Sequence, residues 1–413
     1  MIIVRAALYA SMNARLKRLK WLMIIKECMD KNKKILEGSQ AIAAVINNIR
    51  PGVVSAYPIT PQTHIVEKLA KLKADGRANY EYVRAESEFA AASIVLGASA
   101  AGIRSYSATS SQGLLLMSEV VFNIAGMRLP VVMTCANRAI SAPINIWNDH
   151  SDIMSVRDAG WISLFAGDNQ EAVDLHILAY KLAEQLHLPV FVNVDGFILT
   201  HAYEPVIIPD KKLIKKYLPD YKPTEGTYLN PANPKTLGAF FPPAHYMETR
   251  QDLHNDLTLG LEVIKKEYKS LNKILGRKNN DNGLIKYYGP KKPEIVLVSL
   301  GSVIGTMRET INGSDQLRKK VGILQIKTYR PFPAKEINKI LSGVKNIAVI
   351  EKAISFGQAG PLFSDLQASL EKKTNLSNFI VGLGGRDITQ KTIREIIKQA
   401  AKKNTAPHFI ATI

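Results

Sequence analysis

The 413-residue chain is too long for one ordinary hydrophobic core, so two domains are the natural expectation. Hydrophobic residues make up 46% of it and charged residues 22%, the proportions of a folded globular protein, and no uninterrupted apolar stretch reaches the roughly 18 residues that a membrane-spanning helix needs. The formal net charge of +18 fits either an acidic partner or a solvated lysine-rich surface, but the lysines do not alternate with aromatic residues, which argues against a nucleic-acid-binding module.

Residues 1–33 form a basic extension, with no acidic residue before Glu27. This composition superficially resembles a transit peptide, although the segment lacks the unbroken apolar core of a secretory signal. A flexible extension, or a misassigned start with Met23 or Met29 as the initiator, explains it equally well. We therefore expect residues 1–33 to lie outside the folded domains.

Residues 34–210 are predicted to form the first domain. Strand-like apolar runs, bounded by glycine, proline or small polar residues, lie at residues 52–59, 103–109, 129–136 and 188–196. Segments of helical length and periodicity lie at residues 60–76, 85–102, 113–128 and 169–187. Strands that alternate with helices predict a doubly wound α/β domain, whose parallel sheet binds ligands at the carboxyl ends of its strands.

The second half of the chain changes character twice. Residues 211–292 are rich in proline and turn-forming residues, and we interpret them as a connecting arm with one helix, near Arg250 to Arg277. From residue 293 strand-like and helical runs alternate again, which predicts a second, smaller parallel α/β domain over residues 293–413.

Three loops at predicted strand ends carry candidate ligand-binding residues. Thr60 in YPITPQT lies between two prolines that fix φ and present its hydroxyl at a strand-to-helix corner, although Thr60 or Thr63 could simply cap the helix. Gly113 in ATSSQGLLLM would let a bulky ligand approach the backbone. Arg138 is suited to capture a carboxylate, although such an arginine alone is more often a surface or salt-bridge residue.

Glu86 and Glu88 stand directly before a run rich in alanine, glycine and serine. Carboxylates in the first turn suit the helix dipole, so simple capping is one interpretation. Small residues let neighbouring backbones approach closely, however, so this helix is expected to be central and a carboxylate at its start partly desolvated. Desolvation raises the pKa of a carboxyl group and prepares it to exchange a proton.

The sequence predicts no metal site. The two cysteines, Cys28 and Cys135, are far apart and cannot build a disulfide framework, a zinc site or an iron–sulfur site, and they fit a reducing, cytoplasmic compartment. NDHSD, residues 148–152, imitates a metal cluster, but adjacent ligands cannot easily converge on one ion, and His150 is better explained as ordering the loop. The glycine-rich segments GSVIGT, from Gly301, and GLGGRD, from Gly382, lack the features of phosphate-binding loops.

Five segments together closely resemble the alpha subunit of multi-subunit pyruvate:ferredoxin oxidoreductases, in that family's order: AYPITPQT, VRAESEFAAASIVLGASAAGIRSYSATSSQGLLLMSE, LPVVMTCANRAISAPINIWNDHSDIMSVRDAGWI, VNVDGFILTH and GLGGRD. The resemblance runs from about Lys34 to the end of the chain. It implies a first domain that binds the aminopyrimidine half of thiamine diphosphate and a second domain like the C-terminal domain of transketolase. It also implies oxidative decarboxylation of pyruvate to acetyl-CoA and CO2, with electron transfer to ferredoxin.

The resemblance implies roles for individual residues. Glu88 stands where the family's glutamate hydrogen-bonds the pyrimidine N1′, and a proton shared there is needed for the cofactor's imino group to act as a base. Thr60 and Arg138 stand where the family contacts the substrate carboxylate, and with Glu88 they are the expected catalytic residues. The expected cofactor contacts, besides Glu88, are Tyr57, Pro58, Ile59, Ser111 and Gln112.

The chain has no GDG…N motif for diphosphate and magnesium and no cysteine set for a cluster, so we expect it to work only with partners. By resemblance, a beta subunit brings the diphosphate and Mg²⁺ site, a delta subunit the iron–sulfur clusters, and a gamma subunit completes the assembly. Coenzyme A, a 2-oxoacid and ferredoxin are the other reactants, and no nucleic acid or membrane is expected to bind.

Two other functions remain open from the sequence. Alpha subunits acting on branched-chain 2-oxoacids such as 2-oxoisovalerate look similar, because small changes in pocket volume decide the substrate. A non-catalytic basic scaffold that has kept the fold is the third interpretation, and the joint presence of Glu88, Thr60 and Arg138 speaks against it.

Overall fold

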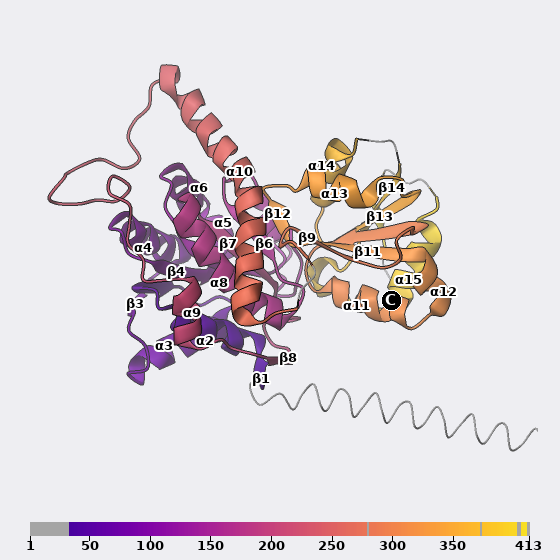
Figure 1. Cartoon of the computed structure of the whole chain (residues 1–413), viewed down its shortest axis with the longest axis horizontal. Coiled ribbons are helices and arrows are strands. Elements are labelled where there is room, and N and C mark those ends of the chain that lie inside the picture. Colours follow the sequence, from indigo (N-terminus) through magenta and orange to yellow (C-terminus); the bar gives the residue numbers. More distant parts are fainter. Residues whose placement is uncertain (1–32, 279–280, 372–373, 403–405, 411–413) are drawn as a thin grey trace, which may run out of the picture.

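The computed structural model describes residues 33–278, 281–371, 374–402 and 406–410. Apart from Lys33, the extension predicted for residues 1–33 lies outside these ranges. The described chain forms two sheet domains side by side, with one long helix running along the first of them (Figure 1). Within these ranges, no helix combines the length and the apolar character needed to cross a membrane.

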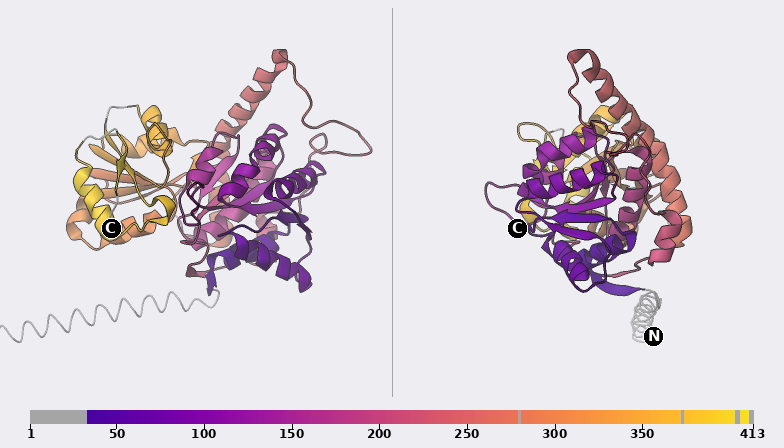
Figure 2. Two further views of the ribbon diagram at one scale, coloured as in Figure 1. Left: turned by 180° about the vertical axis from the view of Figure 1, so that it is seen from behind. Right: turned by 90° about the vertical axis from the view of Figure 1, so that its left-hand side faces the viewer.

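The first domain is built on a seven-stranded sheet in the order β12-β6-β7-β5-β4-β2-β3, in which β12 is antiparallel to β6 and the remaining pairs are parallel. Its strands are β2 (Val53–Ala56), β3 (Glu81–Arg84), β4 (Ser105–Thr109), β5 (Val132–Asn137), β6 (Ile162–Phe165), β7 (Val190–Asp195) and β12 (Thr328–Arg330). Every residue of β4 to β7 is buried, since helices cover both faces of the sheet (Figure 2). This arrangement confirms the predicted α/β class.

Two groups of helices cover this sheet. The helices are α2 (Gly38–Ile49), α3 (Thr63–Ala74), α4 (Glu88–Ala100), α5 (Ser111–Leu116), α6 (Ser118–Gly126), α7 (Ser151–Ser155) and α8 (Asn169–Leu186). Helix α2 packs against α3 and α8, and α4 packs against α5 and α6. The helix predicted over residues 113–128 is in fact two, because the chain turns at Met117 between α5 and α6.

Helix α4 follows directly from its sequence. The Ser87 hydroxyl accepts a hydrogen bond from the Ala90 backbone at 3.1 Å and so caps the first turn. The alanine-rich body then lies against β2 and β4, where small side chains allow close packing. Glu86, for which capping was one interpretation, is exposed, and Ser87 caps the helix because its short side chain reaches the free N–H groups.

The connecting arm differs from its prediction in two ways. It holds two helices, α9 (Lys211–Tyr217) and α10 (Pro243–Leu275), because the Asp210 side chain caps a short amphipathic turn at Leu213 N, 2.7 Å away. Helix α10 packs along α8 and α9, and its first turns project beyond the body of the molecule (Figure 1). In addition, β9 (Ile285–Tyr288), inside the expected arm, pairs with β11 of the second sheet.

The second domain carries a six-stranded sheet in the order β15-β14-β13-β10-β11-β9, parallel except for β9. Its other strands are β10 (Ile295–Ser299), β11 (Val321–Ile326), β13 (Asn346–Glu351), β14 (Asn375–Ile380) and β15 (His408–Phe409). Its helices are α11 (Val303–Asn312), α12 (Asp315–Lys320), α13 (Ala334–Leu341), α14 (Pro361–Ser369) and α15 (Gln390–Gln399), with a short 3-10 turn η1 (Leu383–Gly385). A small antiparallel pair of β1 (Lys34–Glu37) with β8 (Tyr203–Val206) completes the fold.

Candidate functional site

The candidate site lies at the carboxyl ends of β2, β4, β5 and β7, where the predicted motifs leave the first sheet. Parallel neighbours place these ends along one edge, so loops far apart in the sequence meet there. This is the edge at which the alternation of strands and helices predicted ligand binding.

Glu88 is the first residue of α4 and is only 9% exposed. No described residue donates a hydrogen bond to its carboxylate. A buried carboxylate costs free energy unless it is paired, so an unpartnered one marks a place where a ligand group can complete the bonding. The short helix α5 lies directly against this side chain.

Gly113 of α5 makes room for Glu88. A Cβ atom at Gly113 would lie 2.7 Å from Glu88 Cγ, 2.8 Å from Glu88 Oε1 and 2.6 Å from Thr109 Oγ1. A side chain at this position would therefore displace Glu88 and Thr109, so Gly113 makes room for the glutamate. The approach of a bulky ligand to this part of the backbone stays a prediction.

Three further polar atoms of this region are buried and lack a hydrogen-bond partner within the described chain: Gln62 Oε1, Thr109 Oγ1 and Gln112 Nε2. Gln62 is itself held in place, because its Nε2 donates to the carbonyl oxygens of Tyr57 at 2.8 Å and Ala108 at 3.0 Å. The loops after β2 and β4 thus present unpaired donors and acceptors, which a heteroaromatic ligand can use.

Arg138 and Thr60 are brought together. The guanidinium donates from Nη1 to the Thr60 carbonyl oxygen at 2.8 Å and from Nε to the Asn145 carbonyl oxygen at 2.9 Å. Burial lowers the pKa of Arg138 from its ordinary value, and its side chain keeps Nη2 without a partner among the described residues. The Thr60 side chain is exposed beside it. Nε and Nη1 of the arginine therefore hold the loops of Asn145 and Thr60, and Nη2 is available to an anion.

The other residues predicted to contact the cofactor differ in how exposed they are. Tyr57 is 38% exposed, Pro58 is exposed, and Ile59 is half-buried. Ser111 is buried, with φ of 48°, and its hydroxyl donates to the Ala139 carbonyl oxygen at 2.5 Å. Gln112 offers the free amide already described. The carboxyl-end loops thus carry all these residues, and their contacts with a cofactor remain predictions.

Asp152 is a residue of this site that sequence reasoning missed. Its carboxylate accepts from the backbone N–H groups of Ser111 at 3.0 Å and Arg138 at 2.9 Å, and from Asn137 Nδ2 at 3.2 Å. Burial raises its pKa to about 6, although the backbone donors act in the opposite direction. The side chain thus fixes the loops after β4 and β5 relative to each other, which no local pattern in NDHSD indicates.

His150 and Asn148 of the same segment belong to a buried network between the two domains. Asp195 lies 2.7 Å from His150 Nε2 and 2.7 Å from Lys352 Nζ, and Lys352 also donates to Asn148 Oδ1 at 2.8 Å. Burial alone would raise the pKa of Asp195, but Lys352 and His150 hold it well below its ordinary value. His150 therefore orders the loop, as expected, through Asp195 and through its backbone N–H, which donates to the Lys352 carbonyl oxygen of the second domain at 2.8 Å.

A cavity of about 410 Å³ opens beside this network. It is lined by Trp147 and Phe197 from the first domain and by both glycine-rich segments of the second, at residues 302–306 and 382–388. The two segments lack the features of phosphate-binding loops, and both face the first domain across this cavity.

Two family models match the chain. Residues 44–269 match the one described as pyruvate flavodoxin/ferredoxin oxidoreductase, thiamine diP-bdg, and residues 293–393 match pyruvate:ferredoxin oxidoreductase core domain II. Pyruvate synthase subunit PorA of Methanothermobacter thermautotrophicus is 42% identical over 368 residues, 89% of this chain and 94% of the relative. PorA of Methanocaldococcus jannaschii is 44% identical over 371 residues, which are 89% of this chain and 95% of the relative. Ketoisovalerate oxidoreductase subunit VorA of Pyrococcus horikoshii is 39% identical over 379 residues, which are 90% of this chain and 94% of the relative.

Solved structures support the fold. A 2-oxoglutarate:ferredoxin oxidoreductase from Magnetococcus marinus, with 2-oxoglutarate, coenzyme A and succinyl-CoA bound, matches at a TM-score of 0.69 and 22% identity over 90% of this chain. This chain spans 66% of that protein's chain. A split-gene transketolase, an inactive beta4 tetramer, matches at a TM-score of 0.52 and 10% identity, over 90% of this chain and 100% of that one.

Proposed function

The chain belongs to the pyruvate:ferredoxin oxidoreductase family, and on this premise we propose that it is the alpha subunit of an enzyme that converts pyruvate, coenzyme A and oxidised ferredoxin to acetyl-CoA, CO2 and reduced ferredoxin. The family membership confirms the resemblance found in the sequence. The enzyme is an oxidoreductase that acts on a 2-oxoacid, with ferredoxin as the electron acceptor.

The observation that carries the residue assignment is Glu88, a residue only 9% exposed whose carboxylate has no hydrogen-bond partner among the described residues. Thiamine diphosphate, when bound, supplies the carbon nucleophile and the electron sink for the 2-oxoacid. The residues present fit its aminopyrimidine half. Within the described part of the chain, an acid at Glu88, an amide donor at Gln112 and two acceptors at Gln62 and Thr109 have no hydrogen-bond partner. Glu88 would hold a proton at the pyrimidine N1′, while Tyr57, Pro58, Ile59 and Ser111 would border the ring.

Arg138 and Thr60 would hold the carboxylate of the 2-oxoacid. The free Nη2 of Arg138 offers a charged donor, and the Thr60 hydroxyl lies on the loop that the same guanidinium fixes. A carboxylate held there is neutralised and oriented before carbon dioxide leaves. Asp152 would support the site indirectly, because its carboxylate fixes the backbone of Arg138 and Ser111.

Partner subunits would complete the site. Large apolar side chains on the site loops are exposed, with exposed fractions of 86% at Ile144, 51% at Trp147 and 45% at Ile198, and Phe89 on α4 is 41% exposed. Exposed apolar side chains of this size around a polar site favour coverage by another polypeptide. A beta subunit would bring the diphosphate and Mg²⁺ site, and delta and gamma subunits the iron–sulfur clusters and the rest of the assembly, in the cytoplasm.

A second candidate substrate is a branched-chain 2-oxoacid, which the 39% identity to a ketoisovalerate oxidoreductase subunit keeps in view. The test is the steady-state rate of ferredoxin reduction by the purified complex with pyruvate, 2-oxoisovalerate and 2-oxoglutarate. Because each methylene changes kcat/KM by roughly 10- to 200-fold, we expect pyruvate to exceed 2-oxoisovalerate by at least about tenfold. The reverse order would assign the branched-chain activity.

A further inference from the structure

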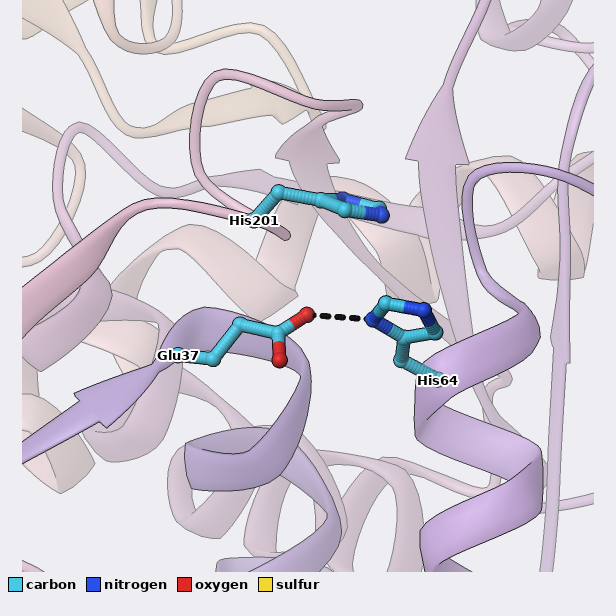
Figure 3. Close-up of side chains that lie close together, drawn as sticks. All are labelled: Glu37, His64 and His201. Carbon is cyan, nitrogen blue, oxygen red and sulfur yellow. Dashed lines mark hydrogen bonds and ion pairs between the residues drawn. The ribbon is translucent and has the colours of Figure 1, made fainter.

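Glu37, His64 and His201 come from three separate elements and meet on one side of the first domain (Figure 3). Glu37 ends β1, His64 lies in the first turn of α3, and His201 follows β7 in the segment VNVDGFILTH. One ligand atom from each lies within 4.8 Å of the other two. Figure 3 shows the two imidazole rings facing each other with the carboxylate beside them.

The three side chains are already held for ligation. Glu37 is 6% exposed, and its Oε2 accepts from Gln40 Nε2 at 3.3 Å, which leaves Oε1 directed at His64. His201 Nδ1 lies 2.8 Å from Thr200 Oγ1, and with Nδ1 donating there the Nε2 atom is left to bind. Outer hydrogen bonds of this kind fix the ring and its tautomer in metal sites.

An ordinary ion pair explains only part of this arrangement. The bond between Glu37 Oε1 and His64 Nδ1, 2.5 Å long, accounts for two of the residues. It does not account for His201, whose ring centroid lies 4.7 Å from that of His64. Two imidazoles and one carboxylate within reach of one point form a set that a cation can share.

We propose that Glu37, His64 and His201 bind one divalent transition-metal ion, for which Zn²⁺ is the best match. Two nitrogen ligands and one carboxylate oxygen suit Zn²⁺, whereas Mg²⁺ and Ca²⁺ prefer oxygen ligands throughout. Zinc bonds of about 2.0–2.2 Å require the ligand atoms to move somewhat closer together, and the His64 side chain, 47% exposed, has the freedom to do so.

The ion would join elements next to the candidate site without being part of it. Helix α3 begins directly after the loop that carries Thr60. The His201 ring contacts the Phe197 ring at a centroid distance of 4.7 Å, and Phe197 in turn contacts Trp147 at 4.5 Å. Metal binding would therefore tie the start of α2, the start of α3 and the loop after β7 into one unit.

The test is calorimetric titration of Zn²⁺ into the untagged full-length chain after chelator treatment. We expect one ion per chain, undiminished by excess Mg²⁺, and an unfolding midpoint raised by at least about 2 °C. Loss of an outer partner alone changes metal affinity by 10- to 100-fold, so His64→Ala and His201→Ala are each expected to weaken binding by at least about 100-fold. His245→Ala, at an exposed histidine of α10, is the matched control and should bind normally.

If the cluster is only an ion pair, any Zn²⁺ that the chain binds lies elsewhere, and His201→Ala leaves the Zn²⁺ affinity unchanged. That result, or binding in the double variant His64→Ala/His201→Ala within about threefold of the parent, would overturn the proposal. Absence of Zn²⁺ binding by the parent chain would do the same. If His201→Ala fails to fold, His64→Gln replaces it, since an amide can still donate to Glu37 but is a poor zinc ligand.

Discussion

The guanidinium of Arg138 donates a hydrogen bond of 2.8 Å to the carbonyl oxygen of Thr60, although the two residues lie on loops that follow different strands. A second bond, from Nε to the Asn145 carbonyl oxygen, fixes the orientation of the same group. The arginine therefore shapes the loop of Thr60 as well as carrying the charge that we assign to substrate binding.

Replacement of Arg138 by alanine should remove both effects. We expect kcat/KM for pyruvate to fall by about 10- to 150-fold, mainly through KM, because a charge-assisted contact is worth about 1.5–3 kcal/mol. Steady-state kinetics of the assembled complex measure this change. Arg77→Ala, at an exposed arginine beyond α3, should leave both constants unchanged. Normal kinetics in the Arg138 variant would show that another group holds the carboxylate.

Replacement of Glu88 by glutamine keeps the size of the side chain but removes the acid. We expect the complex to assemble and 2-oxoacid-dependent ferredoxin reduction to fall by at least about 100-fold, because the positioned proton is worth about 10²–10⁴ in rate. Glu86→Gln is the matched control, since Glu86 is exposed two residues away. Near-normal turnover in the Glu88 variant would remove the glutamate from its assigned role.

Gly113→Ala should damage the site through packing alone. The added methyl group would overlap Glu88 Cγ and Thr109 Oγ1, so both side chains must move. Overpacking should cost about 1–3 kcal/mol of the free energy of unfolding, and the roughly 1 kcal/mol that alanine gains over glycine in a helix offsets part of it, so we expect a net loss of up to about 2 kcal/mol. Thiamine diphosphate affinity, measured with the assembled complex, should fall as Glu88 is displaced.

Gly97→Ala offers the control for that variant. Gly97 lies in the exposed part of α4, and a Cβ atom there would meet nothing within 4 Å. Helix propensity then acts alone, so this variant should be as stable as the parent or more stable by up to about 1 kcal/mol. Equal stability of the Gly97 and Gly113 variants would mean that Glu88 and Thr109 can move away from the added methyl group without loss of stability.

The parts of the site that follow from local patterns were predictable from the sequence. Strand ends flanked by proline and small residues located the loops of Thr60, Ser111 and Arg138, since parallel strands collect such loops at one edge. The position of Glu88 at the start of a small-residue helix predicted its burial, which its 9% exposure confirms. The alternation of strands and helices similarly predicted two α/β domains.

Features that depend on distant partners were not predictable in this way. Asp152 finds its donors at Ser111 and Arg138, which a reading of NDHSD alone cannot foresee. Strand β12, from the second half of the chain, pairs at the edge of the first sheet. Lys352 is counted in the positive charge that suggested a solvated surface, yet it is 2% exposed and bound to Asp195.

Glu351 at the end of β13 gives a prediction for pH dependence. Burial raises its pKa from 4.5 to about 8, although the Leu362 backbone at 2.8 Å and Asn378 Nδ2 at 2.6 Å act in the opposite direction. Between about pH 4.5 and pH 8 the folded chain therefore keeps a proton that the unfolded chain releases. The stabilisation is complete below this range and is lost as the pH rises through it.

The measurement is the thermal unfolding midpoint of the chain and of Glu351→Gln between pH 5 and pH 9. The variant cannot ionise, so the difference in stability between the two proteins should shift in favour of the variant as the pH rises, by a few kcal/mol in total at about 1.4 kcal/mol per pKa unit. Glu371→Gln, at an exposed position, should follow the parent at every pH. Parallel curves for the parent and Glu351→Gln would mean that the carboxyl group titrates alike in the folded and unfolded chains.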